Sequence, residues 1–161
     1  MIGKDHFIDQ FLDFIGGSPT PFHAVSQMAL RLEAAGFTFL DESRAWQLHA
    51  GQKYYTTRNG SSLIAFSLGA DAAEQGLRML GAHTDSPCLK IKPQPELNRH
   101  GYSQLALEPY GGVLLNPWFD RDLSIAGKVV YDTLQGQMAS VLVDFSRPVL
   151  TIPSLAIHLD K

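Results

Sequence analysis

A histidine and an aspartate two residues apart, His83 and Asp85, directly follow the short apolar run of residues 77–82. In an extended chain, residues i and i+2 point to the same face, so both side chains can converge where a strand ends. Ligand crevices form at the carboxyl ends of strands in α/β sheets. Imidazole is a common zinc ligand, and a nearby carboxylate can fix its tautomer. The pair is therefore a candidate metal site; the alternative is a histidine that is simply hydrogen-bonded in a turn.

Other kinds of site have weaker support. The sequence contains no His-Glu-x-x-His, no Cys-x-x-Cys and no glycine-rich phosphate loop. Composition leaves a Ser-His-Asp triad open, although no Gly-x-Ser-x-Gly elbow supports one. Cys88, close to the candidate pair, is interpreted as a buried inert thiol. The charged group Asp120, Arg121 and Asp122 is either a solvated turn or part of an ion-pair network.

Two helices are expected ahead of this pair. Apolar residues at helical spacing predict a helix over residues 7–15. Thr20 is a good N-cap for a second helix, and Pro21 suits its first position, where a missing N–H costs nothing. Gly36 is expected just after the end of that helix.

The hydrophobic period then changes to two. Residues 52–58 and 61–68 are predicted strands, and Asn59-Gly60 between them is a strong hairpin signal. The apolar run 77–82 is predicted to be a buried strand that leads directly to His83.

The second half of the chain is expected to be a small all-β unit. Turn residues separate four short strand-like runs, which are residues 103–108, 112–115, 125–131 and 140–145. Composition shifts at Pro93-Gln94-Pro95, so we expect a boundary near residue 93. The fold class is α/β, with residues 1–92 as one part and residues 93–161 as another.

Composition excludes several classes of protein. Of 161 residues, 45% are hydrophobic, which is enough to bury a core. The net charge is −3 with no basic stripe, so a nucleic-acid partner is not expected. No stretch approaches the roughly 18 apolar residues of a membrane span, and the N-terminus does not resemble a secretory signal. With a single cysteine, the expectation is a cytoplasmic protein without a membrane partner.

The residues around His83 also carry a family resemblance. The stretch Gly81-Ala82-His83-Thr84-Asp85-Ser86-Pro87 resembles the first metal-ligand motif of the aspartyl aminopeptidase family, within the clan of two-zinc exopeptidases. Four further stretches are similar to that family and occur in its order across nearly the whole chain: Ser18-Pro19-Thr20-Pro21-Phe22-His23-Ala24, Tyr110-Gly111-Gly112, residues 117–124 and Leu155-Ala156-Ile157-His158-Leu159.

The resemblance implies a role for three residues. His83 would be a zinc ligand, and Asp85 would be the catalytic-site carboxylate that orients the metal site. His158 would be either a zinc ligand or a substrate-binding residue that reaches a neighbouring subunit's site, and the second role is favoured. The implied cofactor is a pair of zinc ions. The implied reaction removes N-terminal Asp or Glu from peptides.

The resemblance also implies an architecture. Residues 1–92 would be the N-terminal piece of a two-zinc exopeptidase-like α/β catalytic domain. Residues 93–161 would be an inserted, β-rich and barrel-like dimerisation module, in a protein that assembles into homo-oligomers.

Family members are much longer, and their other zinc ligands and catalytic Glu have no counterpart in residues 1–161. A catalytic zinc needs three protein ligands and a nearby base, so this chain alone is expected to be catalytically incomplete. It would then be a fragment or a truncated reading frame. One alternative is a non-catalytic interaction module that pairs with itself or with a full-length relative. Another is a hydrolase of the same clan with a different substrate.

Overall fold

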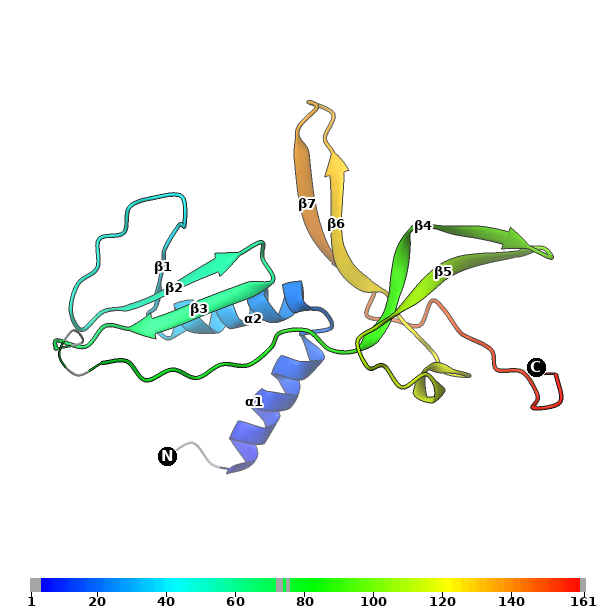
Figure 1. Ribbon diagram of the computed structural model, residues 1–161, viewed down its shortest axis with the longest axis horizontal. Coiled ribbons are helices and arrows are strands. Elements are labelled where there is room, and N and C mark those ends of the chain that lie inside the picture. The colour runs from blue at the N-terminus through cyan, green and yellow to red at the C-terminus, as the bar shows by residue number, and fades with distance from the viewer. Residues whose placement is uncertain (1–3, 72–73, 75, 160–161) are drawn as a thin grey trace. The chain divides into compact units, whose positions relative to one another are not determined.

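The protein is described by a computed structural model that covers residues 4–71, 74 and 76–159 (Figure 1). It is a mixed α/β structure with small sheets. The chain divides into two compact units. The first consists of Met1–Asp85 and Ala126–Asp144, and the second of Ser86–Ile125 and Phe145–Lys161.

Both expected helices are present in the first unit. Helix α1 spans Lys4–Gly16 and helix α2 spans Pro21–Ala34. The side chain of Thr20 accepts a hydrogen bond from the backbone N–H of His23, as expected of an N-cap. At the other end, Gly36 has φ +83. Its N–H and that of Phe37 donate to the last carbonyls of α2, which is the Schellman arrangement.

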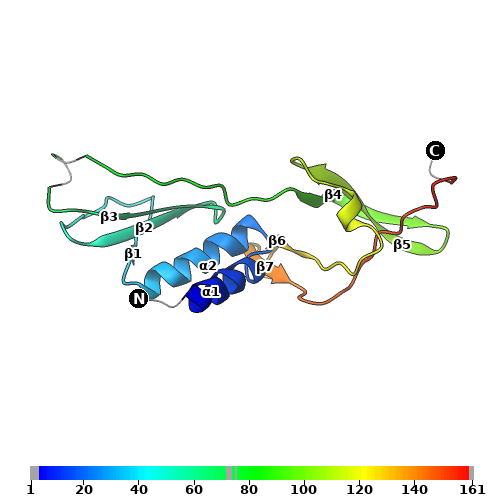
Figure 2. The same cartoon turned by 90° about the horizontal axis from the view of Figure 1, so that it is seen from below.

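A three-stranded sheet covers one side of α2 (Figure 2). Its strands are β1 (Thr38–Phe39), β2 (Lys53–Arg58) and β3 (Ser62–Ser67), in the order β1-β2-β3. Strands β2 and β3 form the predicted antiparallel hairpin, with Asn59 and Gly60 both at positive φ in its turn. The buried residues described in this unit are Ala24 and Val25 of α2, Leu40, and three successive residues of β2, Tyr54, Tyr55 and Thr56. Of those three, Tyr55 faces α2, and Tyr54 and Thr56 lie on the opposite face of the sheet by strand alternation.

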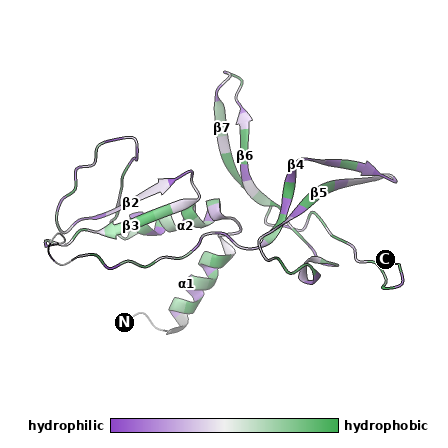
Figure 3. Ribbon diagram, viewed as in Figure 1, coloured by the Kyte–Doolittle hydropathy of each residue, from purple (hydrophilic) through white to green (hydrophobic). Residues whose placement is uncertain are grey.

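A second hairpin completes the first unit. It consists of β6 (Ala126–Asp132) and β7 (Met138–Asp144), paired antiparallel from Ala126 opposite Asp144 to Asp132 opposite Met138. The runs 125–131 and 140–145 were therefore correctly predicted as strands, and they pair with each other. Hydrophobic and hydrophilic residues are mixed along both helices and along β6 and β7 (Figure 3).

The second unit is built on one long antiparallel ribbon. Strand β4 spans Cys88–Arg99 and β5 spans Tyr102–Tyr110, with a register shift between Ile91 and Glu96. The run 103–108 was predicted correctly as part of β5, whereas β4 was not predicted. The domain boundary expected near residue 93 stays a prediction, while the two compact units divide at Asp85 and Ser86, at Ile125 and Ala126, and at Asp144 and Phe145. A short 3₁₀ helix, η1 (Asn116–Trp118), follows β5.

Two predicted strands are wrong. Residues 77–82 form no strand, and their apolar side chains are exposed, with Met79 87% accessible. An apolar run becomes a buried strand only when neighbouring strands pair with it and cover it, and no strand within the described residues does so. Residues 112–115 are also irregular, because they lie in a short glycine-flanked connection between β5 and η1.

The described strands form three separate small sheets and no closed barrel. The barrel-like character expected for the second half is therefore not seen in this part of the chain. Among the residues described, no helix has the length and apolar character needed to cross a membrane.

Candidate metal centre

The segment that carries the candidate pair is extended and lies beside the first sheet. The Thr84 hydroxyl donates a 2.9 Å hydrogen bond to the carbonyl of Ser61, the residue before β3. Thr84 stands between His83 and Asp85, so this bond holds the middle of the candidate pair. The side chains of the two flanking residues fall on one face of the extended chain, as residues i and i+2 do.

His83 and Asp85 do come together. Nδ1 of His83 lies 2.7 Å from the backbone carbonyl oxygen of Asp85 and 3.4 Å from its Oδ1. A carbonyl oxygen only accepts, so the 2.7 Å contact assigns the ring proton to Nδ1. In the neutral ring, Nε2 then keeps its lone pair. The His83 side chain is 82% exposed, which leaves Nε2 accessible to an incoming metal ion.

The donor types fit zinc, which binds imidazole nitrogen and carboxylate oxygen. The number of donors does not complete a site. Within the described residues, no group of three or more His, Cys, Asp and Glu side chains is placed to hold a metal ion. A catalytic zinc generally has three protein ligands. The described part of the chain therefore brings together one imidazole and one carboxylate, fewer than the three ligands that a catalytic zinc needs.

His158 belongs to the second unit, whereas His83 belongs to the first. Residues 157–159 form an exposed turn in which the N–H of Leu159 donates to the carbonyl of Ala156 at 2.7 Å. The ring of His158 is thus open to solvent and is not enclosed in an apolar strand. The structure leaves the proposed roles of His83, Asp85 and His158 as predictions.

A group of hydrogen bonds that the sequence did not reveal lies just ahead of His158. Oδ1 of Asp120 accepts a 3.1 Å bond from the N–H of Ser154, and its Oδ2 accepts a bond from the Ser154 hydroxyl. The Asp120 N–H donates to the carbonyl of Ile152 at 2.9 Å. These bonds from Ser154 hold the pKa of Asp120 below its usual range. No local spacing signals this contact, because the partners are 34 positions apart.

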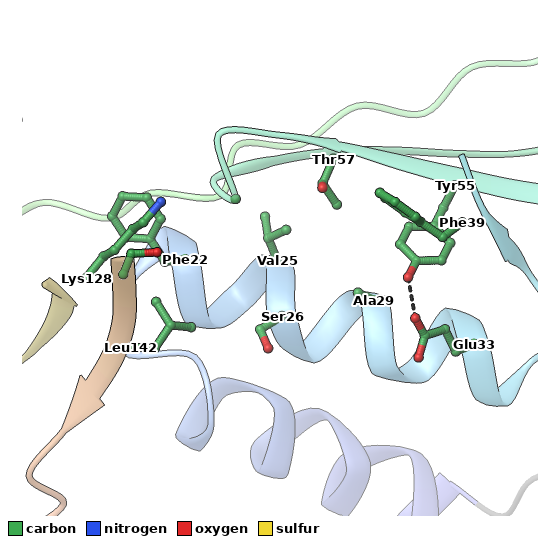
Figure 4. A pocket seen from close by; sticks show the side chains of 12 residues that line it. Phe22, Val25, Ser26, Ala29, Glu33, Phe39, Tyr55, Thr57, Lys128 and Leu142 are labelled. Atoms are coloured by element: carbon green, nitrogen blue, oxygen red, sulfur yellow. Dashed lines mark hydrogen bonds between the residues drawn. The ribbon is translucent and has the colours of Figure 1, made fainter. Parts of the chain in front are cut away.

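An open groove of about 430 Å³ lies elsewhere in the first unit, against α2 (Figure 4). Its apolar lining includes Phe22, Val25 and Leu142, and the Lys128 ammonium lies 5.3 Å from the centre of the Phe22 ring. Neither member of the His83–Asp85 pair lines it. This groove is therefore not the candidate site, since its lining brings no set of metal-ligating side chains together.

Comparison with known proteins identifies the family to which the chain belongs. The family described as "Aminopeptidase I zinc metalloprotease (M18)" matches residues 14–161. A protein of Ectopseudomonas mendocina, "Probable M18 family aminopeptidase 2", is 56% identical over 159 residues, which are 98% of this chain and 37% of that protein. The protein of the same name in Azotobacter vinelandii is 57% identical over 151 residues, 93% of this chain and 35% of that one.

Solved structures that resemble this chain are aminopeptidases as well. The structure of Chaetomium thermophilum mApe1 matches with a TM-score of 0.88 and 38% identity, over 97% of this chain and 36% of that chain. The S. cerevisiae mApe1 dodecamer matches with a TM-score of 0.84 and 41% identity, over 93% and 36%. Fold and family model together define a zinc metalloprotease class. The chain belongs to the M18 aminopeptidase family, and it spans a little over a third of the curated relatives it matches.

Proposed function

We propose that the whole protein is a zinc-dependent aminopeptidase that removes N-terminal Asp or Glu from peptides. In this proposal the present chain contributes one zinc ligand, His83, and the carboxylate that orients it, Asp85. The observation that carries the proposal is the 2.7 Å contact of His83 Nδ1 with the Asp85 carbonyl, which leaves an exposed Nε2 for the metal.

Each member of the pair has a distinct task. His83 would coordinate through Nε2, and the backbone carbonyl of Asp85 would hold the tautomer that makes this possible. The Asp85 carboxylate, with Oδ1 at 3.4 Å from Nδ1, places negative charge beside the ring and would help to fix its orientation. Two zinc ions, when bound, would polarise the scissile carbonyl and lower the pKa of a bound water.

His158 is proposed as a substrate-binding residue, with metal ligation as the second option. Its exposed turn in a unit separate from His83 supports contact with a substrate held elsewhere, including one held by a neighbouring subunit. We propose further that residues 93–161 form a barrel-like dimerisation module of a homo-oligomer and that residues 1–92 belong to the catalytic domain. The S. cerevisiae relative is described as a dodecamer, which supports assembly.

The chain by itself is proposed to be inactive. One imidazole and one carboxylate do not supply three ligands together with a general base for the attacking water. The single cysteine and the absence of a basic stripe support a cytoplasmic enzyme that acts on peptides. The alternative function is a non-catalytic interaction module, which the exposed apolar side chains of α1 favour, namely Phe7, Ile8, Phe11, Leu12 and Ile15.

The test compares the 161-residue chain with a chimera in which residues 1–161 replace the matching part of the Ectopseudomonas mendocina relative. Chromogenic peptides with N-terminal Asp or Leu are supplied with added zinc. We expect cleavage by the chimera only, with preference for Asp, and its loss in His83→Ala. His100→Asn is the matched control, because His100 lies in the exposed β4–β5 turn at φ +53, which Asn tolerates.

Each contrary result has a definite meaning. Metal-dependent cleavage by the 161-residue chain alone would show that it holds a complete site. Preference of the chimera for Leu would overturn the acidic specificity. If His83→Ala cleaved as well as His100→Asn, His83 would not be a zinc ligand.

A further inference from the structure

We propose that Asp120 is a positioning residue for His158. Its carboxylate and its backbone N–H together fasten the segment of residues 152–159, so that the His158 ring is presented from a defined place. The proposal rests on the proposed function only in assuming that His158 contacts substrate. The attachment itself is a property of the second unit, to which Asp120, Ser154 and His158 all belong.

Three hydrogen bonds from one residue reach this segment. The Asp120 N–H donates to Ile152, and the two carboxylate oxygens accept from the N–H and the hydroxyl of Ser154. The acceptor is an ionised carboxylate, and charge-assisted bonds of this kind are roughly twice as strong as neutral ones. The carboxylate accepts from both the N–H and the hydroxyl of Ser154, so it fixes the orientation of the Ser154 backbone as well as its distance from Asp120.

The segment has few other restraints. Upstream, Leu123 pairs with Leu150 in an isolated β-bridge, with bonds of 2.9–3.1 Å that include the N–H of Val149. Beyond residue 150 the chain contains no helix or strand as far as residue 159. Among the described residues, the hydrogen bonds of Ser154 are the last that attach this segment to the rest of the unit before the turn at residues 157–159, and His158 follows only four residues later.

The backbone of Asp120 is specialised for this contact. Its φ is +52, a left-handed conformation that most residues disfavour and that Asp tolerates better than most. Next to it, the Arg121 guanidinium donates to the Pro117 carbonyl at 3.3 Å and closes the turn from the other side. The unusual φ lets the N–H and the carboxylate of one residue face the same neighbouring segment.

The contact is at the surface, so water competes with it and its effect on global stability is screened. The contact instead controls the position of the local segment that carries His158. Without the carboxylate, residues 151–159 would keep the β-bridge upstream and the bond from the Asp120 N–H to the Ile152 carbonyl, but Ser154 would lose both of its bonds to Asp120. The His158 ring would then sample many positions. Ordering it on substrate binding would cost conformational entropy and weaken that binding.

Two variants separate the side chain from the backbone. Asp120→Gly permits the positive φ but removes both acceptors, and Asp120→Asn tolerates the positive φ and keeps one carbonyl acceptor. Ser154→Ala removes only the hydroxyl donor and provides an independent variant if Asp120→Gly folds poorly. Asp122→Gly is the matched control, since it makes the same change two positions along the same charged turn.

Amide hydrogen exchange of the 161-residue chain tests the attachment directly. We expect the Ser154 amide to exchange about tenfold faster in Asp120→Gly, about threefold faster in Asp120→Asn, and at the parent rate in Asp122→Gly, in line with a hydrogen bond to a charged group. Unchanged exchange in Asp120→Gly would overturn the proposal, whatever the function of the whole protein.

Kinetics of the chimera then test the link to His158. We expect Asp120→Gly to raise KM about tenfold with a smaller change in kcat, and Asp120→Asn to recover part of the loss. The double variant Asp120→Gly with His158→Ala should be no worse than His158→Ala alone, because one residue acts through the other. Additive losses would overturn the positioning role. A harmless His158→Ala would remove the role of His158 and leave only the exchange result.

Discussion

The hydroxyl of Tyr55 in β2 donates a hydrogen bond to Oε1 of Glu33 in the last turn of α2. Tyr55 is only 3% exposed. Its burial raises its pKa to about 12, and the hydrogen bond and negative charge of Glu33 contribute to the same shift. This hydrogen bond is one of the contacts between the sheet and α2, and it makes their junction sensitive to alkali.

The first prediction concerns that sensitivity. The folded-state pKa of Tyr55 is raised above its ordinary value of 10.0, so the stabilisation is fully present below pH 10.0 and is lost as pH rises through about 12. Tyr55→Phe should cost about 1 kcal/mol at neutral pH, the net value of a typical hydrogen bond, and should weaken the alkaline loss of stability. Denaturant unfolding measured across this pH range tests both effects.

The control for this measurement is Tyr102→Phe, which changes a tyrosine that is 71% exposed. It should leave both the neutral and the alkaline free energy of unfolding close to the parent values. An unchanged alkaline step in Tyr55→Phe would assign that step to other groups.

The second prediction concerns the start of α2. Thr20→Ala removes the oxygen that accepts from the His23 N–H and should lower the free energy of unfolding by about 1 kcal/mol. Thr20→Ser keeps the acceptor and should change stability by a few tenths at most. Circular dichroism during denaturant unfolding distinguishes the two, and equal losses in both variants would contradict a capping role.

The third prediction concerns the β2–β3 turn. Gly60 has φ +67, and a methyl group there would meet only the Phe22 ring, at 4.0 Å. The cost of Gly60→Ala is therefore conformational and should be about 1 kcal/mol. Asn59→Gly, at the neighbouring position with φ +55, should be nearly neutral. Thermal unfolding of the two variants tests this difference, and a harmless Gly60→Ala would argue against the described turn.

The fourth prediction concerns the apolar segment ahead of His83. Leu77, Met79 and Leu80 are all more than three-quarters exposed. Exposed apolar surface of this kind promotes association, so Met79→Lys should reduce self-association of the chain without lowering its unfolding temperature. Light scattering and thermal unfolding measure the two properties. A marked fall in unfolding temperature would mean that this segment is packed in solution.

The fifth prediction concerns zinc in the chimera. Asp85→Ala should weaken zinc binding about 10- to 100-fold, the usual effect of removing a group that orients a histidine ligand. Asp85→Asn keeps an oxygen near Nδ1 but removes the charge, so it should lose less. Competition with a chromogenic chelator gives the affinities without relying on activity. Equal affinities in parent and Asp85→Ala would exclude Asp85 from the metal site.

Local elements were predicted well because the forces that form them are local. Helix α2 depends on Thr20, Pro21 and Gly36. The Thr20 side chain accepts a bond from an N–H of the first turn, and Pro21 has no N–H that would be left unpaired there. The Gly36 N–H donates to a carbonyl of the last turn. The β2–β3 hairpin depends on Asn59 and Gly60, whose tolerance of positive φ sets the turn and hence the pairing register. The convergence of His83 and Asp85 follows in the same way from their spacing in an extended segment.

The sequence by itself thus determined the helices, the first hairpin, the candidate metal pair and the family resemblance. Tertiary structure decided the rest. Residues 77–82 have the composition of a buried strand but no pairing partner within the described residues, and β4 became a strand through β5 although it contains Pro93 and Pro95. The contact of Asp120 with Ser154 joins residues 34 positions apart. Such pairings depend on which other segment the folded chain places alongside, and the residue pattern within one segment does not identify that partner.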